Sequence, residues 1–131
     1  MQTEINLSIN KLNDAVNRLR EGCENVKDDL DKDGVIQRFE FTFELLWKCL
    51  KVILEDKGII CRSPKDCLKE AFKYELINDE EIFLDMLNDR NKTSHLYDKD
   101  EADKIYQRVN NVYLTYIVNT AQEITDKHYI D

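Results

Sequence analysis

Hydrophobic residues recur at helical intervals along almost the whole chain. In residues 2–21, Ile5, Ile9, Leu12, Val16 and Leu19 are spaced by alternating steps of four and three, which places them on one helix face. Residues 101–125 follow the same template, and no stretch shows the strict alternation that is typical of a β-strand. The pattern therefore predicts helices over residues 2–21, 31–57, 65–76 and 101–125, with a further one starting near residue 80.

The predicted helix over residues 31–57 is apolar on more than one side. A helix of this kind must be covered on more than one side, so it is either the centre of a bundle or also meets a second subunit. Its main stripe and the residues that widen it are Ile36, Phe39, Phe43, Leu46, Leu50 and Ile53, then Phe41, Leu45, Trp47 and Leu54.

Helix boundary signals divide the rest of the chain. Gly22 and Gly58 suit helix ends, and Ser63-Pro64 suits the start of a short helix with Leu68, Ala71 and Phe72 facing inward. Asp79 and Glu81 mark the start of the next helix, because carboxylates favour the positive end of a helix. These signals predict an all-α fold: an antiparallel four-helix up-and-down bundle with an additional short helix, forming a single domain over residues 1–131.

Composition supports this fold and excludes several functional classes. The 131 residues include only three glycines and one proline, fewer than a fold with many tight turns needs. The net charge of −8 argues against a general nucleic-acid coat or a membrane-surface binder. No apolar run approaches the ~20 residues that span a bilayer, so we expect a cytoplasmic protein without membrane association.

The cysteines and histidines do not suggest a metal site or a disulfide framework. The cysteines form no C-x-x-C pair, and only two histidines are present. We therefore expect no metal and no cofactor, and four reduced thiols. The four cysteines are Cys23, Cys49, Cys61 and Cys67.

The apolar stripe of the fourth predicted helix breaks at residue 90. Continued from Phe83, Met86 and Leu87, the stripe reaches Arg90, Ser94 and Tyr97. An arginine buried without a partner costs several kcal/mol, and such conflicts concentrate at functional sites. Residues 90–97 also contain Arg90, Lys92 and His95 but no carboxylate, so a small cationic segment interrupts an acidic chain.

An arginine and a histidine in this arrangement suit chemistry on phosphate esters. The arginine fork matches phosphate oxygens, while an imidazole can accept a proton from a ribose 2′-hydroxyl or donate one to a leaving oxygen. The alternative is structural: Arg90 pairs with a carboxylate, either nearby or on a neighbouring helix, and His95 is solvated. Glu40 and Glu44 are candidates for that partner.

The segment resembles a known family. Arg90, His95 and Tyr97 match the R-x-x-x-x-H-x-Y motif of HEPN-domain proteins, in which a polar residue such as Asn91 commonly follows the arginine. The run 38–48, Gly58 and the Ser63-Pro64 start are similar to the branch called nucleotidyltransferase substrate-binding proteins.

The resemblance implies a homodimeric helical bundle that acts as a metal-independent endoribonuclease toxin on RNA. Its partner would be a minimal nucleotidyltransferase, which silences the toxin by adding AMP to a tyrosine. Carried over to this sequence, Arg90 and His95 would be catalytic, Asn91 auxiliary and Tyr97 the AMPylation target. The same branch also supports another interpretation, a non-catalytic substrate-binding subunit of a two-component nucleotidyltransferase.

Overall fold

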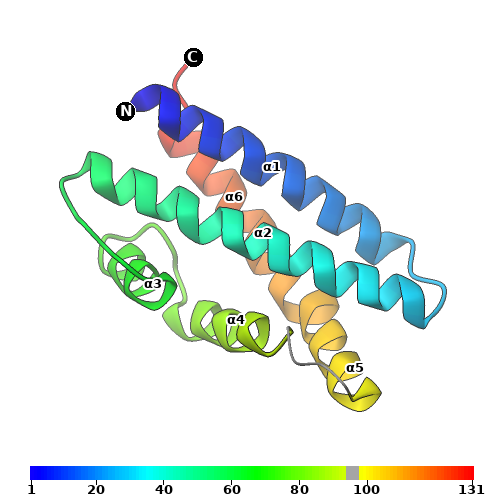
Figure 1. The fold of residues 1–131 in the computed structure, drawn as a ribbon. Coiled ribbons are helices and arrows are strands. Elements are labelled where there is room, and N and C mark those ends of the chain that lie inside the picture. Colours follow the sequence, from blue (N-terminus) through cyan, green and yellow to red (C-terminus); the bar gives the residue numbers. More distant parts are fainter. Residues whose placement is uncertain (94–97) are drawn as a thin grey trace.

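The computed structural model describes residues 1–93 and 98–131, and all regular structure within these ranges is helical. Figure 1 labels the α-helices. In chain order the elements are α1 (Gln2–Glu24), α2 (Asp29–Asp56), α3 (Pro64–Lys73), α4 (Glu80–Thr93), α5 (Lys99–Arg108), the π-helical segment η1 (Val109–Tyr113) and α6 (Leu114–His128).

The long helices form the predicted bundle. In Figure 1, α1 and α2 run side by side in opposite directions, and α5 and α6 form one long helical run that crosses behind them. The chain passes from α2 through the short α3 into α4, and the N- and C-termini lie close together. The prediction of an all-α four-helix bundle with an additional short helix is confirmed.

Helix α2 lies at the centre of the core. Phe39, Phe43 and Leu50 are fully buried, and the ring of Phe39 stacks on Tyr113 with centroids 5.6 Å apart. Burial on several sides agrees with the wide apolar stripe of the sequence. Phe41 departs from this pattern, since 59% of its surface remains exposed.

The predicted helix starts hold, but the end predicted for the first helix is wrong. The side chain of Ser63 accepts a hydrogen bond from the backbone N–H of Asp66, and Gly58 follows α2 with φ of +81°. Gly22, however, lies inside α1, which continues to Glu24. A Cβ at Gly22 would come within 3.3 Å of the Arg38 side chain, so this glycine permits close packing and does not end the helix.

The short helix α3 ends earlier than predicted, at Lys73. The chain then turns at Glu75, which has φ of +62°, and this turn delivers Leu76 and Ile77 to the core. Leu68 and Ala71 face inward as expected, but Phe72 is 42% exposed, so its predicted burial is wrong.

The expectation of four reduced thiols is also wrong in this structure. Cys61 and Cys67 form a disulfide, with their Cα atoms 5.2 Å apart. The chain turns at Ser63-Pro64, and this turn places Cys61 against the first turn of α3. The spacing of six residues alone did not reveal this proximity. Cys23 and Cys49 are free thiols.

The predicted helix over residues 101–125 is longer and less regular than its pattern suggested. It extends from Lys99 to His128, and residues Val109–Tyr113 form a π-helical turn within it. A π-turn inserts an extra residue into the helical register and occurs frequently at functional sites. This turn carries Tyr113 toward α4, as described below.

Candidate functional site around Arg90

The predicted site residues fall at the end of α4 and just beyond it. Arg90 and Asn91 belong to the last turn of α4, which ends at Thr93. His95 and Tyr97 lie outside the described residues, so their roles stay predictions. The geometry available is therefore that of the arginine and its surroundings.

Arg90 is held by hydrogen bonds at both terminal nitrogens. Its Nη2 donates to Glu44 Oε2, across from α4 to α2, and its Nη1 donates to Asn91 Oδ1 at 3.2 Å. About a third of the Arg90 side chain stays exposed to solvent. The structural alternative, a carboxylate partner on a neighbouring helix, is thus present, and it leaves part of the guanidinium accessible.

Glu44 binds two further donors from its own helix. The indole Nε1 of Trp47 donates to Glu44 Oε2 at 3.0 Å, and Lys48 Nζ lies 3.4 Å from Glu44 Oε1. Partial burial raises the pKa of Glu44, but the Trp47 hydrogen bond and the charges of Arg90 and Lys48 outweigh burial. The pKa of Glu44 therefore lies below its ordinary value, and the carboxylate is ionised at neutral pH.

The charged side chain buried by α4 is Asp89, and the expectation that Arg90 occupies a core position is wrong. Asp89 is only 4% exposed, whereas Arg90 lies at the edge of the bundle. Asp89 follows Met86 by three residues and so continues the inward face of α4. That spacing was the signal in the sequence, and it was missed because the stripe was extended from Leu87 instead.

Asp89 binds two partners from the last long helical run. Arg108 donates Nε and Nη2 to its two carboxylate oxygens at 2.7 and 2.8 Å, and the Tyr113 hydroxyl donates to Oδ2. The pKa of Tyr113 is raised, first by burial and then by Asp89, and the hydrogen bond to Asp89 raises the pKa of Arg108. This buried cluster fixes the last turn of α4 against α5 and η1.

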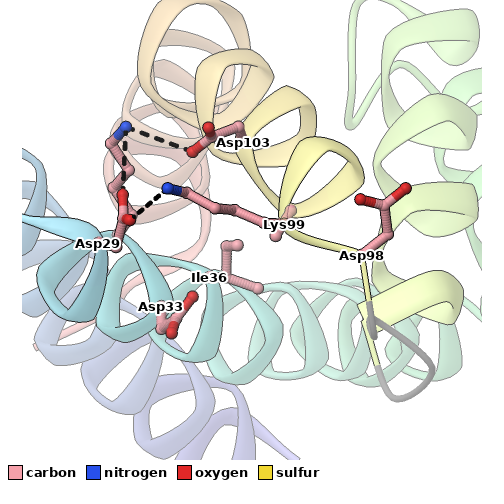
Figure 2. Close-up of a pocket in the computed structure, with 8 residues that line it drawn as sticks. Asp29, Asp33, Ile36, Asp98, Lys99 and Asp103 are labelled. Carbon is pink, nitrogen blue, oxygen red and sulfur yellow. Dashed lines mark hydrogen bonds and ion pairs between the residues drawn. The ribbon is translucent and has the colours of Figure 1, made fainter.

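A separate pocket of about 310 Å³ lies between the first turns of α2 and α5. Figure 2 shows its lining, in which Lys99 reaches Asp29. Lys32, on α2, forms an ion pair with Asp103. The Lys99 Nζ to Asp29 distance is 2.8 Å. Four aspartates and two lysines line this pocket, so its net negative charge would repel a phosphate.

Two further observations concern metals and membranes. Across residues 1–93 and 98–131, no three His, Cys, Asp or Glu side chains are grouped closely enough to hold a metal ion. In the same part of the chain, no helix has both the length and the apolar character needed to cross a bilayer.

Comparison with known sequences connects this geometry to a family. The family model described as "Nucleotidyltransferase substrate binding protein like" matches residues 5–126. The Haemophilus influenzae protein named "Probable ribonuclease HepT" is 36% identical over 81 residues, covering 58% of this chain and 56% of that protein. The chain therefore aligns with little more than half the length of this curated relative.

Two solved structures share the fold. One, from Thermus thermophilus, is 30% identical with a TM-score of 0.79, covering 86% of this chain and 98% of the other. Another, from Haemophilus influenzae, is described as revealing the fold of a substrate-binding domain of a nucleotidyltransferase. It is 25% identical with a TM-score of 0.67 and covers 95% of this chain and 98% of the other.

Proposed function

Because this chain belongs to the family of nucleotidyltransferase substrate-binding-like proteins, we propose that it is a metal-independent endoribonuclease toxin paired with a minimal nucleotidyltransferase. The observation that carries the proposal is Arg90, a partly exposed arginine that is held by Glu44 and Asn91 and precedes His95 by five residues in the sequence. The name of the Haemophilus influenzae relative, a ribonuclease, supports the same activity.

In the proposed reaction, Arg90 and His95 cleave RNA without a metal. The ribose 2′-oxygen attacks the adjacent phosphorus while the bond to the 5′-oxygen breaks, which yields a 2′,3′-cyclic phosphate and a 5′-hydroxyl. The Arg90 guanidinium stabilises negative charge that develops on the phosphoryl oxygens. His95 takes the proton from the 2′-hydroxyl or gives one to the leaving oxygen, and a second copy of the chain supplies the other role.

Asn91 takes an auxiliary role in this proposal. Its amide oxygen accepts a hydrogen bond from Arg90 Nη1, which supports one side of the guanidinium. The Asn91 side chain is exposed at the end of α4, so its amide nitrogen can also reach a bound phosphate.

The direct test is cleavage of a labelled single-stranded RNA in EDTA. We expect the wild type to leave cyclic-phosphate ends, and His95→Ala and Arg90→Ala each to lose cleavage while remaining helical. His128→Ala and Arg62→Ala are matched controls, because they remove the other histidine and an exposed arginine of the α2–α3 connection. Cleavage that survives both site substitutions would place the activity elsewhere.

The proposed regulation is transfer of AMP to Tyr97 by the nucleotidyltransferase partner. An adenylyl group there would add bulk and negative charge to the proposed site and so oppose RNA binding. We expect a mass gain of one AMP on the Tyr97 peptide after incubation with the partner and ATP, and none in Tyr97→Phe. Absence of the adduct after co-expression with the partner would rule this regulation out.

The proposed assembly is a homodimer with two sets of Arg90 and His95 around one cleft. The wide apolar stripe of α2, of which Phe41 stays 59% exposed, is consistent with contact to a second chain. Light scattering after size exclusion should give a dimer at micromolar concentration. A monodisperse monomer would count against this arrangement.

A second candidate function is a non-catalytic substrate-binding subunit of a two-component nucleotidyltransferase. The description of the Haemophilus influenzae structure and the pairing of Arg90 with Glu44 both favour it, since the pair reduces the charge offered to RNA. It predicts nucleotide binding by an unmodified dimer together with no cleavage by wild type or by His95→Ala.

A further inference from the structure

We propose that Glu44 is the positioning residue of Arg90: it orients the guanidinium toward the phosphate of the RNA and does not itself touch the reacting atoms. This inference rests on the proposed ribonuclease function. It adds a residue of α2 to a site that the sequence motif confines to residues 90–97.

The Glu44 carboxylate is itself fixed before it meets Arg90. Trp47 and Lys48 follow Glu44 by three and four residues, so both lie beside it on α2. The indole of Trp47 binds Oε2 and the ammonium of Lys48 faces Oε1. Both oxygens are therefore engaged by α2, and Oε2 is aimed at α4.

Arg90 is constrained while part of its guanidinium remains free. Glu44 engages Nη2 and Asn91 engages Nη1, which uses two of the five N–H donors of the group. The remaining donors lie on a side chain that is 32% exposed. A free arginine would lose rotamer freedom when it bound a phosphate, whereas this arginine is already ordered.

The charge of Glu44 has the opposite effect on RNA binding. A carboxylate next to the phosphate-binding arginine repels the phosphate, so removing its charge should strengthen ground-state association. Replacing the carboxylate with an amide also weakens its charge-assisted hydrogen bond to Arg90, which should leave Arg90 less well aligned in the transition state. Positioning therefore predicts a lower kcat with a KM that does not rise.

The variant Glu44→Gln tests this prediction in the full-length protein. We expect kcat on single-stranded RNA to fall by about 10- to 100-fold, with KM unchanged or lower. Glu40→Gln is the matched control, because it removes a half-exposed carboxylate one turn earlier on α2. An unchanged kcat, or a loss that lies wholly in KM, would overturn the proposal.

Trp47 provides a readout that does not depend on cleavage. It is the single tryptophan of the chain, and its indole N–H binds the same oxygen as Arg90. Glu44→Gln and Arg90→Gln should both change its fluorescence emission, and Glu40→Gln should not. If Arg90→Gln leaves the emission unchanged, Arg90 is not coupled to Glu44 and the proposal fails.

Thermal unfolding separates failure of this proposal from failure of the proposed function. The decrease in Tm of the double variant Glu44→Gln and Arg90→Gln should be smaller than the sum of the decreases of the two single variants. Both single changes remove the same ion pair. Additive losses would overturn the positioning role. If the variants show this coupling but the wild type cleaves no RNA, the ribonuclease function is overturned and the coupling between Glu44 and Arg90 stands.

Discussion

At the scale of single residues, Asp89 and Arg90 point to different sides of α4. Asp89 is buried and bound by Arg108 and Tyr113, whereas Arg90 reaches the edge of the bundle and binds Glu44. Neighbouring residues on a helix differ by about 100° in direction, so one turn can serve both the core and a site. Asp89 thus fixes the turn from which Arg90 projects.

Replacing Asp89 with asparagine should destabilise the fold. The change leaves Arg108 and the Tyr113 hydroxyl facing a neutral amide, and breaking a fully buried ion pair costs about 3–5 kcal/mol. Since 38% of the Arg108 side chain is exposed, we expect a smaller loss of about 2–3 kcal/mol. Urea denaturation measures it, with Asp85→Asn on the exposed face of α4 as the control. Equal stability of the two variants would contradict the role given to Asp89.

The depressed pKa of Glu44 predicts a dependence of stability on pH. The Glu44 carboxyl has a higher pKa in the unfolded chain than in the fold. Its contribution to the free energy of unfolding is therefore present above the unfolded pKa and is lost as pH falls through the folded pKa. At pH 7 the free energy of unfolding of the wild type should exceed that of Glu44→Gln by about 1 kcal/mol. This difference should shrink below about pH 4.3, as followed by denaturation at several pH values. A difference that stays constant down to pH 3 would exclude this linkage.

At the scale of elements, the helices before and after α4 are each fixed at their N-terminus by specific contacts. The N-terminus of α3 is capped by Ser63 and joined through Cys67 to Cys61. The N-terminus of α5 is capped by Asp98, whose side chain accepts the Asp100 N–H. The ion pairs of Figure 2 connect the start of α5 to α2. Both the start of α3 and the start of α5 are therefore anchored.

The disulfide predicts a stability that depends on reductant. In the chain-entropy description, closing a loop of this size lowers the entropy of the unfolded chain and stabilises the fold by about 2 kcal/mol. Dithiothreitol should lower the Tm of the wild type but not that of the double variant Cys61→Ser and Cys67→Ser. Thiol counting before and after reduction should rise from two to four. Four reactive thiols in the untreated, unfolded protein would show that the bond does not form.

At the scale of the whole molecule, 27 acidic residues outnumber 19 basic ones. The net charge is −8, and the pocket between α2 and α5 is itself acidic. Two exposed lysines lie near Arg90. Lys92 follows it by two residues on α4, and Lys48 pairs with Glu44, the α2 partner of Arg90. In the proposed function, RNA would meet these two lysines together with Arg90.

This charge distribution predicts a weak salt dependence of RNA binding. Three cations that each neutralise one phosphate of a single strand should give a slope of log K against log salt of about −2. Titration of a 2′-deoxy oligonucleotide, which lacks the attacking hydroxyl, measures the slope without cleavage. Lys48→Ala should reduce it by about 0.7, and Lys69→Ala on α3 should not. A slope steeper than about −5 would indicate a larger basic surface.

The sequence by itself determined the helical class, the order of the helices and most of their starts. These features depend on local rules: periodic apolar residues, capping side chains at Ser63 and Asp79, and glycine at a left-handed position after α2. It also singled out Arg90, because a cation on an interrupted apolar stripe is a local conflict, whereas Asn91 was selected through the family resemblance. His95 and Tyr97 were selected through the family motif and lie outside the described residues.

The tertiary structure alone decided which partners these residues have. Glu44 was only one of several carboxylates open to Arg90, and neither the Asp89 cluster, the π-turn before Tyr113 nor the disulfide at Cys61 was predicted. The contacts of Glu44 and Asp89 depend on how helices distant in sequence rotate against one another, whereas the disulfide depends on the turn at Ser63-Pro64. A helical repeat fixes the direction of a side chain relative to its own axis, but the packing of the whole core fixes what lies opposite.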